Sequence, residues 1–247
     1  MLDAHCHIDR YKTPIKIAKD AERKGVFTIA MTNLPSHFLA GLPHVRGLKN
    51  LRLAVGLHPL ANKQHLQELK LFEQSLSLTS FVGEVGLDFS REGKKTRAIQ
   101  TETFRFVAKQ LAGENKVTSL HSRGAESEVL DILSEFNISA AIFHWFTGTP
   151  SLLDEAIVQG HYFSVNPAMI RSENGVKIIE RIPRDRILTE SDGPYVKNGK
   201  FSIRPWDVID IEKYLSSVWG VSPDEASAMI WGNFRRLLAQ NNLIHES

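Results

Sequence analysis

The sequence predicts an α/β fold in which eight parallel strands, each followed by a helix, close into a (β/α)8 TIM barrel with an additional C-terminal helix. Eight short runs of apolar and β-branched residues alternate with amphipathic segments of helical period, which is typical of repeated strand–helix–strand units. The runs are almost wholly apolar, as in LRLAVGL at 51–57 and AAIF at 140–143, so both faces of each strand should be buried. The length of 247 residues matches one such barrel.

The predicted elements follow one another along the whole chain. We expect strands at residues 2–8, 26–32, 51–58, 81–88, 117–122, 140–146, 162–167 and 186–192. We expect helices at residues 14–24, 36–48, 62–76, 94–113, 126–136, 151–159, 175–182 and 223–240, with the stretch 205–219 following the last strand. Ser222, followed by a proline and then by Glu225, predicts the start of the last helix. An open doubly wound sheet is the structural alternative, but strand number and chain length favour closure.

Composition restricts the class of protein. Hydrophobic residues make up 42% and charged residues 23% of the chain, as in ordinary globular proteins, and no linker-like stretch divides it, so we expect one domain over residues 1–247. No apolar run approaches the ~18 residues that suggest a membrane helix, and the N-terminus does not resemble a secretory signal. A single cysteine, Cys6, excludes an intrachain disulfide and fits the reducing cytoplasm. The net charge of +2 does not predict a protein that coats nucleic acid.

Side chains that can bind divalent metals recur at the predicted C-terminal ends of strands. They are His5, His7, His58, Glu84, Asp88, His121, His144 and Asp192. In a closed barrel these ends form one rim, where active sites lie. Five of the ten histidines fall at such ends, although these positions make up roughly a tenth of a barrel chain and chance would place about one there. Because burying several unpaired imidazoles would be costly, the pattern predicts a metal site.

The His-x-His motif has a geometry of its own. Side chains at positions i and i+2 of a strand point to the same side, so His5 and His7 can bind one ion together, while Cys6 faces the helical layer as a small buried apolar residue. The candidate ligands offer nitrogen and carboxylate oxygen, which suits Mg²⁺, Mn²⁺, Zn²⁺ or Fe²⁺ and disfavours a structural zinc–cysteine site. Six ligands exceed the need of one four-coordinate ion, so we expect two divalent ions with Glu84 as a candidate bridge.

Seven short stretches carry a family resemblance. They are DAHCHID at 3–9, VGLHPL at 55–60, GEVGLDF at 83–89, HSRGA at 121–125, HWFTG at 144–148, TESDGPY at 189–195 and GNFRRLL at 232–238. In them the chain resembles the TatD-like deoxyribonucleases of the amidohydrolase superfamily, in the family's order and over nearly the whole length. The resemblance implies a metal-dependent hydrolase that cleaves phosphodiester bonds in DNA, as a 3′–5′ exonuclease on single-stranded ends.

The resemblance also implies roles for individual residues. It implies that His5 and His7 bind one metal with Asp192 close by, that Glu84 bridges two metals, and that the second metal is bound by His121 and His144. It places His58 near the substrate and makes Arg123 a phosphate contact. Two departures, Trp145 in place of a small residue and GKFSIRPWD at 199–207 in place of an RNxP pattern, predict a divergent substrate groove.

A mechanism follows as a hypothesis. Asp192 would accept the proton of the attacking water, with Glu84 as the second catalytic carboxylate, and Glu190 would support a histidine from behind. Arg123 and His58 would orient the phosphate oxygens, because the planar guanidinium matches two oxygens. The alternative for Arg123 is a surface ion pair with Glu126 or Glu128.

Other rim residues allow weaker predictions. Four aromatic side chains are candidates for stacking on a nucleobase: Phe89, Trp145, Phe146 and Tyr195. The remaining histidines are expected at the surface: His37, His44, His65, His161 and His245. On the last helices, Trp219 and Trp231 would either dock a partner or cap the barrel.

Two other functions remain open from the sequence. A barrel metallohydrolase acting on a small amide, ester or lactone would need the same metal chemistry. A nuclease-like subunit of a multi-protein defence or repair assembly would also keep the ligands. We expect a monomer that takes DNA as substrate and does not contact membranes, which leaves open a protein partner encoded in the same operon.

Overall fold

The strands of the barrel follow one another in chain order. The computed structural model describes residues 1–61 and 63–244, and in this part the parallel strands are β1 (Leu2–Cys6), β2 (Phe27–Ala30), β3 (Leu51–Leu53), β4 (Phe81–Gly86), β5 (Val117–His121), β6 (Ile142–His144), β7 (Tyr162–Val165) and β8 (Ile187–Thr189). Hydrogen-bonded ladders join β1 to β3 and β4 to β8. Every pairing within these two ladders is parallel, as the apolar runs predict.

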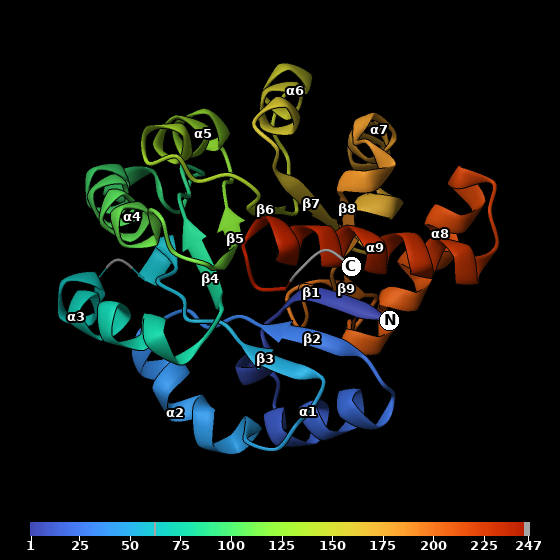
Figure 1. The fold of residues 1–247 in the computed structure, drawn as a ribbon, viewed down its shortest axis with the longest axis horizontal. Coiled ribbons are helices and arrows are strands. Elements are labelled where there is room, and N and C mark those ends of the chain that lie inside the picture. The colour runs from blue at the N-terminus through green and yellow to red at the C-terminus, as the bar shows by residue number, and fades with distance from the viewer. Residues whose placement is uncertain (62, 245–247) are drawn as a thin grey trace.

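Backbone contacts join the two ladders into a ring. On one side Val55 pairs with Val82 in a parallel bridge, and Leu57 N donates to Glu84 O at 3.0 Å. On the other side Asp192 N, just beyond the end of β8, donates to the carbonyl of His5 in β1 at 2.9 Å. The strands therefore form the predicted barrel, which Figure 1 shows surrounded by its helices.

The helices surround the strands, except that the last helix lies across one end of the barrel (Figure 1). They are α1 (Pro14–Arg23), α2 (Pro35–Val45), α3 (His65–Ser75), α4 (Arg97–Leu111), α5 (Glu126–Glu135), α6 (Pro150–Val158), α7 (Glu173–Arg181), α8 (Ile209–Trp219) and α9 (Pro223–Gln240). The bounds of α1–α7 and α9 agree with the predicted helices to within a few residues, except that predicted residue 62 lies outside the described part. α9 begins at the predicted cap, where Ser222 and Glu225 bond each other's backbone N–H groups.

The last helix closes the end of the barrel at which the strands begin. Asn233 on α9 donates to the carbonyl of Ile187 at 2.8 Å, and Tyr162 donates to Gln240 at 3.0 Å. Trp231 packs edge to face on Phe27, with ring centroids 5.8 Å apart, and Trp219 is buried. The two tryptophans thus belong to the cap of the barrel, and the opposite end stays open for the site.

The structure differs from the prediction in strand length and in one addition. Most strands end earlier than predicted, as β3 does at Leu53, and a short antiparallel hairpin of β9 (Lys197–Asn198) and β10 (Phe201–Ser202) follows β8. Two of the histidines expected at the surface, His65 and His161, are buried. His245 lies outside the described residues. None of the described helices is both long and apolar enough to cross a bilayer.

Candidate metal centre

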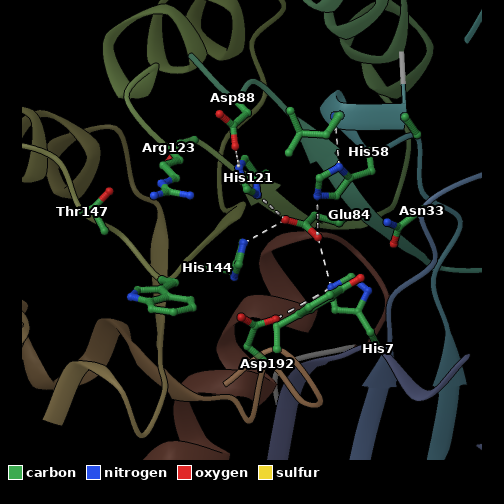
Figure 2. Close-up of a pocket in the computed structure, with 15 residues that line it drawn as sticks. His7, Asn33, His58, Glu84, Asp88, His121, Arg123, His144, Thr147 and Asp192 are labelled. Carbon is green, nitrogen blue, oxygen red and sulfur yellow. Dashed lines mark hydrogen bonds and ion pairs between the residues drawn. The ribbon is translucent and has the colours of Figure 1, made fainter. Parts of the chain in front are cut away.

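A cavity of about 590 Å³ opens at the C-terminal ends of the strands. Seven of the eight predicted strand-end residues line it, namely His7, His58, Glu84, Asp88, His121, His144 and Asp192. The eighth, His5, lies fully buried beneath them, and its ring stacks on that of His144 at a centroid distance of 3.9 Å. Figure 2 shows the side chains converging from different strands. Residues up to 187 positions apart in sequence therefore meet at one mouth, as the barrel predicts.

Glu84 lies at the centre of this cluster (Figure 2). Its Oε1 lies 2.5 Å from His121 Nδ1 and 2.9 Å from His144 Nε2. Its Oε2 lies 3.1 Å from His7 Nε2 and 3.7 Å from His5 Nε2. The two oxygens of one carboxylate therefore face two separate pairs of imidazoles.

Asp192 faces the pair formed by His5 and His7. Its Oδ1 lies 3.9 Å from His5 Nε2 and 3.8 Å from His7 Nε2, and the two imidazole nitrogens are 3.2 Å apart. Two nitrogens bound tetrahedrally to one ion at ~2.0 Å would lie about 3.3 Å apart. The spacing of His5 and His7 is thus that of two ligands of one metal ion.

Backbone conformation places two of the side chains. Asp192 has a positive φ of 43°, a left-handed conformation that costs a non-glycine residue free energy and is often found at functional sites. Gly86 brings β4 close to β5, because a Cβ there would lie 2.0 Å from the carbonyl oxygen of His121. This close approach holds His121 next to Glu84.

Outer contacts decide which ring nitrogens can bind a metal. Asp88 Oδ2 lies 2.8 Å from His121 Nε2, and Glu190 Oε1 lies 3.6 Å from His144 Nδ1. A carboxylate only accepts hydrogen bonds, so each outer nitrogen has an acceptor on which it can keep its proton when the inner nitrogen presents its lone pair to a metal ion. His5 Nδ1 also has an outer partner, the hydroxyl of Ser119, at 2.8 Å. Glu190 therefore lies where it can support a histidine, as predicted.

His58 has the opposite arrangement. The backbone N–H of Leu60 donates to His58 Nδ1 at 3.1 Å, so the proton of the neutral ring lies on Nε2. This Nε2 lies 3.4 Å from Glu84 Oε2. A protonated nitrogen donates a hydrogen bond and does not bind a metal, which separates His58 from the other four histidines.

The charges of the cluster depend on one another. Burial would raise the pKa of Glu84, but His58, His144 and His121 hold it well below its ordinary value. Against the effect of burial, Glu84 and Glu190 raise the pKa of His144, and Glu84 and Asp88 raise that of His121. Burial raises the pKa of Asp192 to about 7.

The nitrogen and oxygen atoms of the cluster have the chemistry that a divalent metal ion needs. Besides the group that contains His58, two overlapping groups of ligand atoms lie within 4.8 Å of one another: His5 with His144 and Asp192, and His5 with His7 and Glu84. His121 Nδ1 lies 2.5 Å from Glu84 Oε1, a hydrogen-bond distance that requires a proton between the two atoms. Imidazole nitrogen and carboxylate oxygen suit Zn²⁺, Mn²⁺ and Mg²⁺, so these buried residues fit divalent metal binding.

The remaining predicted residues lie at the mouth of the cavity. Arg123 lines the cavity and is exposed, and in the described part of the chain it makes no ion pair with Glu126 or Glu128. Of the four aromatic candidates, Trp145 and Tyr195 are exposed and line the cavity. Phe89 and Phe146 are buried in the core, so the prediction that they stack on a base is wrong.

Asp3, which the sequence pattern does not single out, supports the site from below. This buried carboxylate accepts from Ser191 N at 2.8 Å and from Ser191 Oγ at 2.6 Å, beside Asp192. Its alternation with His5 and His7 along β1 is the signal that could have revealed it.

The comparisons with known proteins agree with this geometry. A family model described as TatD related DNase matches residues 2–239. The chain belongs to this family. Its membership confirms the resemblance and the expectation of a metal-dependent hydrolase.

Three similar proteins show how far the likeness to other TatD-related proteins extends. "Deoxyribonuclease TATDN3" of Homo sapiens is 29% identical over 161 residues, which cover 63% of this chain and 58% of the human protein. "Uncharacterized metal-dependent hydrolase YcfH" of Escherichia coli K12 is 29% identical over 96% of this chain and 95% of its own length. The solved structure of the TatD homologue YJJV of Escherichia coli K12 has a TM-score of 0.84 at 22% identity, over 96% of this chain and 97% of that chain, and supports the fold.

Proposed function

We propose that this chain hydrolyses phosphodiester bonds in DNA at a centre of two divalent ions, as a 3′–5′ exonuclease on single-stranded ends. The observation that carries the proposal is the position of Glu84, whose two oxygens face separate pairs of histidines. We assign His5, His7 and Asp192 to one ion, His121 and His144 to the other, and Glu84 to both. When bound, such ions lower the pKa of water and neutralise charge on the phosphate.

The residues of the chain perform the other tasks. Asp192 lies beside the pair of His5 and His7, where its carboxylate accepts the proton of the attacking water. His58 is neutral, because burial lowers its pKa to about 4, and its Nε2–H donates to a nonbridging phosphate oxygen. Arg123 at the mouth binds the phosphate with two N–H groups. These donors match the charge that develops on the phosphate.

The test is digestion of end-labelled single- and double-stranded DNA by the purified protein with Mn²⁺, with EDTA and with Asp192→Asn. We expect cleavage with Mn²⁺, none with EDTA, and a rate at least ~100-fold lower for Asp192→Asn, which is the low end of the effect of a general base. Calorimetry measures whether Asp192→Asn still binds Mn²⁺. A variant that binds Mn²⁺ normally but cleaves slowly has lost the base and not the metal. Unchanged cleavage by Asp192→Asn would contradict the assignment of Asp192 as the base that accepts the proton of the water. Inactivity on DNA together with hydrolysis of a lactone or amide would favour the small-molecule alternative.

A further inference from the structure

A second cavity of about 600 Å³ adjoins the candidate metal centre. One wall is the segment 10–13 that follows β1, and the other is the segment 194–202 that follows β8 and includes the β9–β10 hairpin. Tyr195 lines both cavities, and its ring lies 4.9 Å from that of His7. The second cavity therefore begins where the metal centre ends.

The two cavities differ in charge. Arg10, Lys12 and Lys197 line the second cavity, and none of its lining residues is acidic. Lys12 and Lys197 are exposed and form no ion pair with any described residue, whereas Arg10 pairs with Asp9 at 3.3 Å. Three carboxylates line the first cavity, where metal ions would balance them. The second cavity instead presents its own positive charge.

The walls of this second cavity are held in place. Tyr11 at its base donates to the carbonyl of Ile203 at 2.5 Å, and Ile203 N donates to Val196 O at 3.0 Å. Arg171 donates to the carbonyl of Lys197 at 2.8 Å. The two lysines thus stand on opposite walls, on backbone that is tied to the barrel.

We infer that the second cavity is a subsite that binds the phosphates flanking the scissile one in a nucleic-acid strand. The inference rests on the proposed function and adds what that function leaves open, the path of the strand beyond the metal centre. A strand that passes Tyr195 leaves a cavity lined by carboxylates and enters one whose lining residues include cations and no acids, which matches a polyanion. A small amide or lactone has no second anionic group for this subsite.

The β9–β10 hairpin contributes Lys197 and Ser202 to the lining of the subsite. The subsite therefore sets a preference for longer strands over single nucleotides in this chain.

The binding test uses the Mn²⁺-loaded protein and a fluorescent single-stranded oligonucleotide with phosphorothioate linkages, which keep the charge and resist cleavage. Each phosphate contact contributes about 0.7 to the slope of log K against log salt for single strands. We expect Lys12→Gln/Lys197→Gln to lower this slope by about 1.4, which is an affinity ~25-fold weaker at 0.1 M salt that converges on the wild type near 1 M. Lys109→Gln/Lys213→Gln, with the same charge change on α4 and α8, is the matched control and keeps the wild-type slope.

A second readout compares kcat/KM for a single-stranded oligonucleotide with that for bis(p-nitrophenyl) phosphate, which is too short to reach the subsite. If the subsite exists, Lys12→Gln/Lys197→Gln should lower kcat/KM for the oligonucleotide and leave kcat/KM for bis(p-nitrophenyl) phosphate unchanged. Equal salt slopes for the two double variants would overturn the subsite. An equal loss of kcat/KM on both substrates would also overturn it. If the wild-type protein cleaves neither substrate with Mn²⁺, the proposed function itself fails, which is a distinct result.

Discussion

At the scale of single residues, hydrogen bonds outside the cluster separate histidines that look alike in the sequence. The carboxylate of Asp88 lies within hydrogen-bond distance of His121 Nε2, on the outer side of the ring. The backbone N–H of Leu60 donates a hydrogen bond to His58 Nδ1. The sequence could place both at strand ends because burial and period are local signals. It could not assign the proton on each ring, because that depends on partners such as Asp88 and Leu60, whose positions follow from the folded backbone.

Asp88 allows a test of the outer contacts. In Asp88→Asn the amide keeps an oxygen that can accept from Ser90 N, as Asp88 Oδ1 does at 2.9 Å, but the negative charge behind His121 is lost. We expect Mn²⁺ affinity to fall about 10–100-fold, the usual effect of removing such a partner. Calorimetry at fixed pH measures it. An affinity equal to that of the wild type would show that Asp88 does not orient His121.

At the scale of elements, the predicted helices match better than the predicted strands. The apolar run 51–58 predicts one long strand, but β3 ends at Leu53 while the chain stays buried through Leu57. Apolar residues indicate that a segment is buried, but they do not indicate whether its backbone is paired with a neighbouring strand. The apolar run therefore extends beyond the last residue of β3. Gly56 stays packed against the segment after β2, since a Cβ there would lie 1.7 Å from the carbonyl oxygen of Thr32.

His161 is buried although the hydrophobic period of the sequence predicts it at the surface. It follows α6, where polar residues precede it, yet it is fully buried at the start of β7. Its Nδ1 accepts from Ala141 N at 3.3 Å, and its Nε2 lies 3.4 Å from Gln159 Oε1. Burial, with a smaller effect from Arg186, lowers its pKa from 6.5 to about 4. The folded protein therefore keeps this ring neutral.

A dependence of stability on pH follows from His161. The unfolded chain takes up the proton near pH 6.5 and the folded chain only near pH 4. The stability that the neutral ring contributes is complete above pH 6.5 and is lost as the pH falls toward 4. Between pH 7.5 and 5 the loss is about 2 kcal/mol in the free energy of unfolding.

The variant His161→Gln isolates this contribution from the other titrating groups. Urea unfolding of both proteins at the two pH values should show a stability loss about 2 kcal/mol smaller in the variant. Equal losses in both proteins would mean that His161 titrates normally in the folded state.

At the scale of the whole molecule, the barrel explains why a sequence pattern could locate the site. Candidate ligands from β1, β4, β5, β6 and the segment after β8 converge because parallel strands of a closed barrel end at one mouth. What surrounds that mouth was not predictable, since the β9–β10 hairpin and the second cavity depend on how the segments after β1 and β8 pack together. That residues 1–247 form a single domain stays a prediction.

The convergence also predicts how metal affects the stability of the whole fold. Unfolding separates ligands that lie up to 187 positions apart, so a bound ion stabilises only the folded state. At an Mn²⁺ concentration 100 times its Kd, one site contributes about 2.7 kcal/mol, which for a chain of this size raises the melting temperature by roughly 5–10 °C. Differential scanning calorimetry with Mn²⁺ and with EDTA measures the shift. Glu84→Gln, which removes the shared charge, should reduce the shift to a small fraction. A melting temperature that does not respond to Mn²⁺ in the wild type would contradict a shared metal centre.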